Sequence, residues 1–146
     1  MGTQQASDYL ENKIVDHQFR GGTWAKPVAN WIALFTAAPA DIGGGTEVAG
    51  GGYTRVNLAP SDTNWKATQG GVAGASSGST GTTSNNVAIT FPAPTANWGT
   101  VVAFGIFDAP TGGNLIVWDA LTSPRAILNG DPAPSFPVDA LQITVS

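Results

Sequence analysis

The chain contains no cysteine, one histidine and only six lysine and arginine residues among its 146. Without cysteine it can form neither disulfides nor cysteine-zinc sites, and its redox compartment cannot be inferred. Its six basic residues are scattered, so the basic surface that nucleic-acid binding needs is lacking and no nucleic-acid partner is expected. No apolar run approaches the ~20 residues of a membrane-spanning helix, so no membrane partner is expected either.

Charge is scarce throughout the sequence. Charged residues make up 11% of the chain, against about 25% in an average globular domain. Hydrophobic residues make up 42%, so a packed core is expected, covered by glycine, serine, threonine, asparagine and glutamine. A neutral polar surface repels neighbours weakly, which favours a subunit crowded among others; the alternative is an ordinary small β-protein with many turns. Residues 1–8 lack the apolar stretch of a secretory signal, so export on its own is not expected.

A single helix is expected over residues 8–20. Ser7 or Asp8 can cap its start, and Glu11 follows Asp8 at the spacing of a capping box. Gly21-Gly22 would end it. One face carries its apolar side chains together with the histidine: Leu10, Ile14 and His17. A helix this short is marginal in water, so it must pack against its own body or a neighbouring subunit.

The rest of the chain has the pattern of a β-protein. Seven short strands are expected, over residues 30–37, 53–58, 87–91, 100–107, 114–120, 126–129 and 141–145. Pro110-Thr111-Gly112-Gly113 is a strong hairpin signal between two of them. We therefore predict an all-β fold, a β-sandwich or small jelly-roll-like barrel with one short N-terminal helix. Residues 1–29 would form the helix and a connecting segment, and residues 30–146 the sandwich.

Two segments interrupt the strand pattern. Residues 70–85 are of low complexity, typical of either a flexible loop or an arm ordered by a neighbour. The prolines of residues 123–125 and 131–137 are expected to confine strand pairing there to a sheet edge.

Residues capable of catalysis or metal binding form no recognisable set. His17 lacks further ligands at metal-site spacing, and no serine stands in a Gly-x-Ser-x-Gly turn. Asp108, Asp119 and Asp131 lie near strand ends and could act as paired carboxylates. Aspartates beside glycine or proline are more typical of turns. We expect no catalytic residue, no metal and no cofactor, and hence a protein that is not an enzyme.

The five tryptophans divide into two groups. Trp31 and Trp118 lie inside apolar strands and are expected in the core. Trp24, Trp65 and Trp98 lie in connections. They could anchor an interface or, alternatively, stack on sugar rings; we favour interface anchors.

Several segments, taken in order, resemble a family of small tailed-bacteriophage virion proteins usually labelled tail-fibre proteins. They are SDYLENKIVDH, WIALFTAAPADIGGGTEVAGGGYTRV, FPAPTANWGTVVAFGIFDAPTGGNLIVWDAL and the final LQITV. The resemblance implies a β-sandwich-like structural protein without enzymatic activity. Such a protein would be made in the host cytoplasm and reside in the phage particle.

The resemblance leaves its place in the particle open. One hypothesis is a homotrimeric capsid decoration or cement protein that binds the major capsid protein at capsomer junctions and stabilises the head. Another is a tail-fibre or receptor-binding module that recognises the host surface. A third is a small carbohydrate-active enzyme using the aspartates named above. Contacts with other virion proteins are expected at seven residues: Tyr9, Leu10, Ile14, Phe19, Trp24, Trp65 and Trp98.

Overall fold

The computed structural model describes residues 5–145, which contain one helix and ten strands. The helix is α1 (Asp8–Phe19). The strands are β1 (Gln5–Ala6), β2 (Trp31–Ala37), β3 (Thr46–Glu47), β4 (Val56–Asn57), β5 (Thr82–Ser84), β6 (Ile89–Thr90), β7 (Gly99–Phe107), β8 (Leu115–Ile127), β9 (Ser135–Phe136) and β10 (Gln142–Thr144).

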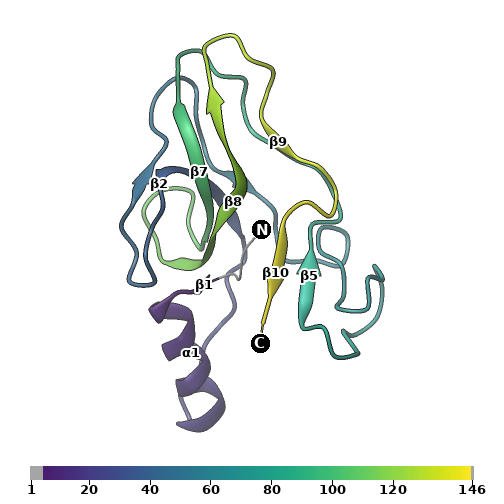
Figure 1. Cartoon of the computed structure of the whole chain (residues 1–146). Helices are drawn as coiled ribbons and strands as arrows, with labels where there is room; N and C mark the ends of the chain where they lie inside the picture. The colour runs from purple at the N-terminus through teal and green to yellow at the C-terminus, as the bar shows by residue number, and fades with distance from the viewer. Residues whose placement is uncertain (1–4, 146) are drawn as a thin grey trace.

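The strands form one large and two small antiparallel sheets (Figure 1). The large sheet has the order β1-β8-β7-β2-β3, and β4 also pairs with β2. The small sheets are β10-β5 and β6-β9. The predicted all-β fold with a single N-terminal helix is confirmed. Within residues 5–145 the pairing does not close into a barrel, so the layered form of the prediction is the better description.

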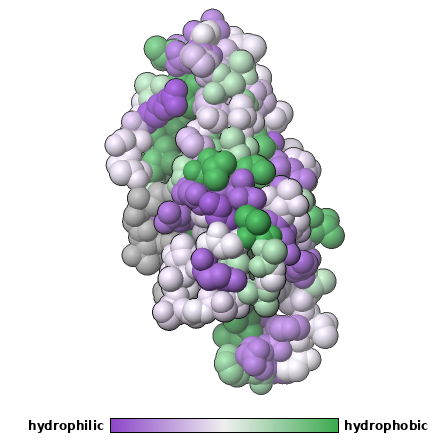
Figure 2. Space-filling view, turned by 90° about the vertical axis from the view of Figure 1, so that its right-hand side faces the viewer, coloured by the Kyte–Doolittle hydropathy of each residue, from purple (hydrophilic) through white to green (hydrophobic). Residues whose placement is uncertain are grey.

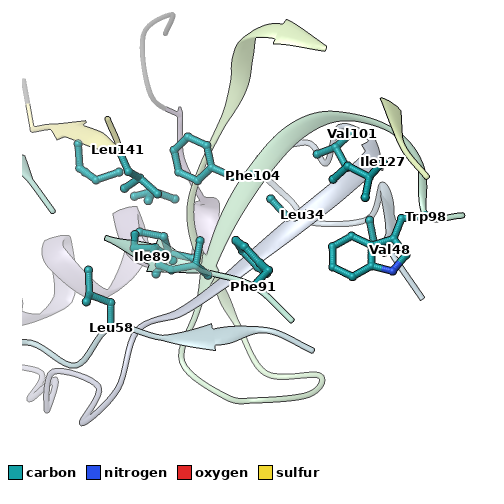
Figure 3. Packing of buried hydrophobic residues seen from close by; sticks show 14 residues of the cluster. Leu34, Val48, Leu58, Ile89, Phe91, Trp98, Val101, Phe104, Ile127 and Leu141 are labelled. Carbon is teal, nitrogen blue, oxygen red and sulfur yellow. The ribbon is translucent and has the colours of Figure 1, made fainter. Parts of the chain in front are cut away.

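The core lies between the large sheet and the two small ones (Figure 3). Ile89 of β6 and Ile143 of β10 belong to the same buried cluster as Phe104 of β7. The ring of Phe136 in β9 lies edge-on to Phe104 and to Phe91, with centroids 6.0 and 6.3 Å apart. The small sheets thus cover one face of the large sheet and supply the second layer that a two-layer β-fold requires.

The central strands follow the sequence pattern closely, because both faces of an apolar strand can be buried. Four consecutive residues of β2, from Ile32 to Phe35, are buried. The prediction is wrong for β8: residues 114–120 and 126–129 were expected to be separate strands. They are one strand, and its register with β7 shifts between Val101 and Ala103. This irregularity accommodates Pro124, which an uninterrupted inner ladder would exclude.

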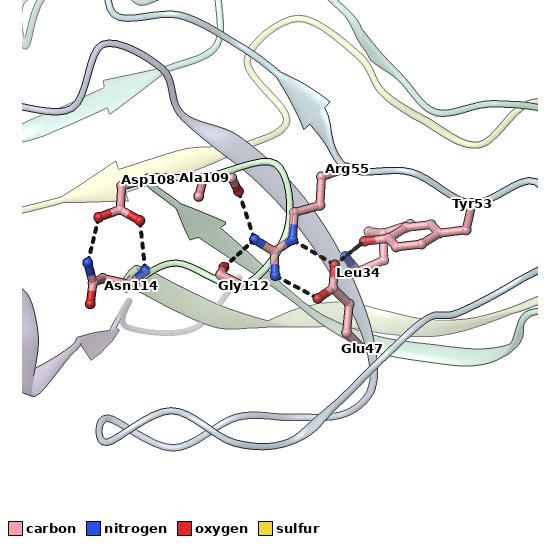
Figure 4. Close-up of polar contacts among 8 residues, drawn as sticks. All are labelled: Leu34, Glu47, Tyr53, Arg55, Asp108, Ala109, Gly112 and Asn114. Carbon is pink, nitrogen blue, oxygen red and sulfur yellow. Dashed lines mark hydrogen bonds and ion pairs between the residues drawn. The ribbon is translucent and has the colours of Figure 1, made fainter.

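A buried arginine ties the edge of the large sheet to the hairpin between β7 and β8 (Figure 4). Arg55 donates from Nε and Nη2 to the two carboxylate oxygens of Glu47, at 2.8 Å each, and from Nη1 to the carbonyls of Ala109 and Gly112. Its guanidinium carbon lies 3.7 Å from the centre of the Phe107 ring. All of these contacts are made by one side chain, so Arg55 joins β3 to the hairpin between β7 and β8.

Tyr53 completes this cluster. Its hydroxyl donates to Glu47 Oε1 at 2.9 Å and accepts from the Leu34 amide at 3.0 Å. Burial of the phenol raises the pKa of Tyr53 well above its ordinary value, with the carboxylate of Glu47 adding to the shift. The phenol therefore remains a donor throughout the neutral and mildly alkaline range.

A buried asparagine plays the same part for the C-terminal segment. Asn85 is 0% exposed. Its Nδ2 donates to the carbonyls of Val87 and Pro137, at 2.8 Å each, and its Oδ1 accepts from the Leu141 amide at 2.9 Å. Its own backbone amide donates to Leu141 O, and its carbonyl accepts from the Asp139 amide. Asn85 thus ties the segment that leads into β10 to the end of β5.

The low-complexity segment folds back on the chain that precedes it. Thr68 Oγ1 donates to the carbonyl of Ser77 at 2.7 Å, and Gln69 bonds to the backbone of both Ala75 and Ser77. The segment then enters β5, which pairs with β10. Polar side chains of the preceding chain therefore satisfy backbone groups of the segment in place of regular strands.

Candidate interaction surface

Helix α1 is anchored to the body at its first residues. Ser7 caps it by accepting a hydrogen bond from the Leu10 amide, and the Ser7 hydroxyl also donates to the carbonyl of Leu115. The Ser7 amide donates to Ile116 O, and the Asp8 amide donates to Asp41 O, both at 3.0 Å. The predicted cap and helix are therefore confirmed, and Ser7 is the capping residue.

Beyond this anchor the helix projects from the body (Figure 1). None of its residues is buried. Leu10, on its first turn, packs against the core cluster as a partly buried side chain. Ile14, Val15 and Phe19 follow with exposed fractions of 42%, 46% and 77%. We call these three residues the helix surface.

The helix surface collects exposed apolar side chains on the element that projects from the body. In the space-filling view, hydrophobic atoms on the body occur in small patches among hydrophilic ones, and they recur on the projecting part at the bottom (Figure 2). The predicted contact residues Ile14 and Phe19 belong to it. Exposed apolar side chains on a projecting element make this surface a candidate contact for a partner.

The connecting segment after α1 turns back toward the body. The Gly22 amide donates to Asp16 O, and Gly21 has the positive φ of 75° that ends the helix. His17 Nδ1 accepts a hydrogen bond from the Trp24 amide at 3.2 Å. The single histidine is therefore exposed on the helix and positions the connecting segment, which places the Trp24 side chain beside the body.

A cleft of about 570 Å³ lies between α1, the connecting segment and the loop that follows β4. Three of the predicted contact residues line it together: Leu10, Trp24 and Trp65. Its apolar lining comes from Ile106 and Ile143 of the facing sheets, among others. The structure thus brings together three residues that lie far apart in the sequence.

Some polar groups around the cleft already have a partner within the chain. Trp65 Nε1 donates to Leu58 O at 3.1 Å, and Lys66 forms an ion pair with Asp139 at 2.6 Å. Others make no hydrogen bond or ion pair with residues 5–145: the side chains of Lys26, Asn30 and Asp62 and the indole N–H of Trp24. Sequence reasoning missed Lys26, Asn30 and Asp62, because the first two and the third come from different connections and no motif marks them.

The Lys66–Asp139 ion pair lowers the pKa of its carboxyl group. Hydrogen bonds from Lys66 and from the Ser84 hydroxyl hold the pKa of the Asp139 carboxyl below its ordinary value. Asp139 also has a positive φ of 66°, which aspartate tolerates better than most residues. The pair therefore fixes the rim of the cleft near β5.

Tyr9 and Trp98 lie elsewhere. Tyr9 lines a second hollow beside the Gly43–Gly45 turn, with Lys13 Nζ 5.5 Å from its ring centre. Trp98, predicted as a contact residue, is 6% exposed and belongs to the core cluster. Its Nε1 donates to Gly51 O at 2.8 Å, so this connection folds inward and satisfies the indole within the chain.

Two other tryptophans are less buried than predicted, whereas Trp98 is more buried. Trp31 and Trp118 were expected in the core but are only partly buried and belong to neither core cluster. Trp118 Nε1 donates to Asp41 Oδ1 at 3.1 Å. An indole needs a partner for its N–H, which a strand's outer face offers more readily than a dry core.

The candidate catalytic carboxylates accept hydrogen bonds from nearby backbone amides. Asp108 accepts hydrogen bonds from the amide and the side chain of Asn114, and Asp131 accepts one from the Leu128 amide. Asp119 is buried, and its Oδ1 accepts from the Ala120 amide. Across residues 5–145 no group of three histidine, cysteine, aspartate or glutamate residues is placed to hold a metal ion. The only helix of that range is too short and too polar to cross a membrane.

Comparison with known proteins gives one family. The family model described as "Podophage GP4 fiber I protein gp80" matches residues 5–144, which is nearly the whole chain. A search of curated protein sequences gives no match.

Proposed function

The chain belongs to the podophage GP4 fiber I protein family, and we propose that it is a non-enzymatic subunit of a phage fibre. In this role the helix surface contacts neighbouring subunits of the virion. The family description names a fibre, and it supports the fibre alternative at least as well as capsid decoration.

One observation carries the proposal: Leu10 packs against the core cluster, but the apolar side chains that follow it on the helix are left exposed. The core residues of β2, β6 and β7 are almost fully buried, while Phe19 is 77% exposed on an element that projects from the body. An isolated 12-residue helix is marginal in water. Burying Ile14, Val15 and Phe19 against a neighbour would remove this exposed apolar surface.

A second copy of the chain is the first neighbour to consider. Fibres are commonly built from repeated subunits, and a closed ring of three copies would bring three helices into mutual contact. Repetition also raises the effective concentration of each contact, so weak individual contacts suffice. We therefore keep the homotrimer as the proposed state.

The self-association part is tested by measuring the solution mass of the purified chain. We expect the wild type to form trimers at micromolar concentration and Phe19→Ser with Ile14→Ser to be a folded monomer. Ile42→Ser is the matched control, because Ile42 is 87% exposed but lies outside the helix surface. A wild type that stays monomeric, or a control as disruptive as the helix variant, would overturn the proposed trimer.

The place in the particle is tested separately. Virions labelled with antibody fragments against this chain should carry label on fibres at the tail. Label distributed over the capsid faces would contradict the fibre proposal and favour decoration of the major capsid protein. Absence of catalysis is tested by incubating particles and purified chain with surface polysaccharides of the host, where we expect no release of shorter saccharides.

A further inference from the structure

The cleft between α1, the connecting segment and the loop after β4 has an aromatic and polar lining that the fibre role does not use. We propose that it binds a neutral saccharide. This inference does not rest on the proposed function, because it depends only on the groups that line the cleft.

The two indoles supply the first part of the argument. The N–H of Trp65 donates to Leu58 O, which fixes its ring at one wall. Trp24 is partly exposed at another wall, and its indole N–H has no partner within residues 5–145. The apolar C–H face of a sugar ring packs well on an indole, and the unused N–H can donate to a hydroxyl.

The uncommitted polar side chains supply the second part. Lys26 is a donor, Asp62 an acceptor, and the amide of Asn30 is both. A sugar hydroxyl is also both donor and acceptor, so it can be matched by each of the three. Polar groups that are placed around an otherwise apolar pocket are the usual determinants of ligand orientation.

Charge decides which class of saccharide fits. Lys26 and Asp62 carry opposite charges, and the charge of Lys66 is already matched by Asp139. The lining therefore has no excess of positive charge to attract a polyanion such as an acidic polysaccharide or a nucleic acid. A neutral, hydroxyl-rich ligand agrees best with this balance.

The size and floor of the cleft agree with the same ligand. Its volume of about 570 Å³ lies within the range of about 300–1,000 Å³ that is usual for small-molecule sites. Ile106, Ile116 and Ile143 contribute apolar surface to the lining. Such a surface can pack against the less polar face of a sugar ring or against the methyl group of a deoxy sugar.

The first experiment screens the wild-type chain on an array of neutral bacterial oligosaccharides. The strongest binder is then titrated while the indole N–H resonances of the five tryptophans are followed by NMR. We expect the Trp24 and Trp65 resonances to shift together with saturation, and those of Trp98 and Trp118 to stay in place. Binding of no oligosaccharide at millimolar concentration, or shifts centred on Trp118, would overturn the proposal.

Two variants test the residues directly. Trp24→Ala and Asp62→Asn should each weaken binding at least tenfold, a factor that corresponds to about 1.4 kcal/mol. The melting temperature should be unchanged, because both residues are outside the core cluster. Trp118→Phe is the matched control and should bind like the wild type. Equal weakening by the control would overturn the assignment.

The competing occupant of the cleft is a second copy of the chain. In that case the Trp24 and Trp65 resonances would shift with protein concentration alone, and the oligosaccharide would not compete. That outcome would overturn the saccharide proposal while supporting self-association. Conversely, a chain that binds the oligosaccharide but labels the capsid would contradict only the fibre proposal.

Discussion

The short strands of the β-sheet body and helix α1 are stabilised in different ways. In the body, short strands are held by buried polar side chains: Arg55 lies beside β3 and β4, and Asn85 lies between β5 and the segment that leads into β10. The helix has no such support after its first turn, and its apolar side chains are exposed. The chain therefore stabilises its body with its own side chains, whereas the exposed apolar side chains of the helix can be buried only by a partner.

This contrast has a physical cause. A polar side chain in the core can satisfy backbone groups from several segments at once, and an unsatisfied buried group is costly. On the helix every backbone group except the ends is satisfied locally. What the helix lacks is burial of apolar surface, which only a second surface can provide.

Among the polar contacts of the body, removing Arg55 should have the largest effect. Arg55→Ala leaves Glu47 and two hairpin carbonyls without their donor and should lower the free energy of unfolding by about 3–5 kcal/mol. Urea denaturation measures this loss. Arg20→Ala is the matched control, because its ion pair with Asp16 is largely exposed and should contribute no more than about 1 kcal/mol. Similar losses in both variants would contradict the role of Arg55.

Removing the Asn85 side chain should come next. Asn85→Ala leaves the carbonyls of Val87 and Pro137 and the amide of Leu141 unsatisfied, and should cost about 2–3 kcal/mol. Hydrogen exchange should rise first at β10 and β5. The control is Asn86→Ala, whose side chain makes one exposed hydrogen bond to Thr63 O. Unchanged hydrogen exchange at β10 in the Asn85 variant would contradict the proposed role of the Asn85 side chain in holding this segment.

Weakening the junction between the two regions should give a smaller and local effect. Ser7→Ala removes the helix cap and the bond to Leu115 O, and should cost about 1–2 kcal/mol. Amide exchange of residues 10–20 should accelerate while the exchange of β7 is unchanged. Ser135→Ala, at an exposed position, should alter neither. Faster exchange of β7 in the Ser7 variant would mean that helix and body unfold together.

Acid should weaken the body through Asp139. Its pKa is lowered in the folded chain, so the carboxylate adds stability above the ordinary aspartate pKa of about 3.9, and this stability is lost as pH falls through the lower folded value. Asp139→Asn keeps the side-chain shape and tolerates the positive φ. Unfolding measured from pH 7 to pH 2 should show a wild-type advantage that shrinks below about pH 4. A constant difference would contradict the linkage.

Changing the helix surface should have the smallest effect on stability. Phe19→Ser should shift the free energy of unfolding of the monomer by no more than about 0.5 kcal/mol. Phe104→Ala, at a fully buried position, should cost about 3–5 kcal/mol. Thermal melts at low protein concentration compare the two. A large loss in the Phe19 variant would mean that the helix surface packs on its own body.

The elements that could be predicted are those whose cause lies within a few residues. The Ser7 cap and the glycines at 21–22 bound the helix, and the apolar runs of β2 and β7 are buried as their patterns indicate. The single strand β8 could not be predicted, because pairing with β7 overrides the local effect of Pro124. The inward position of Trp98 had no local signal either.

The sequence by itself determined the β-class, the helix and its exposed apolar residues, since composition, caps and periodicity act between near neighbours in the chain. Only the tertiary structure decided the partners of Arg55 and Asn85 and the joining of Leu10, Trp24 and Trp65 in one cleft. These contacts span tens of residues. They exist because the small sheets pack across the large one, and no local pattern encodes which loops that packing brings together.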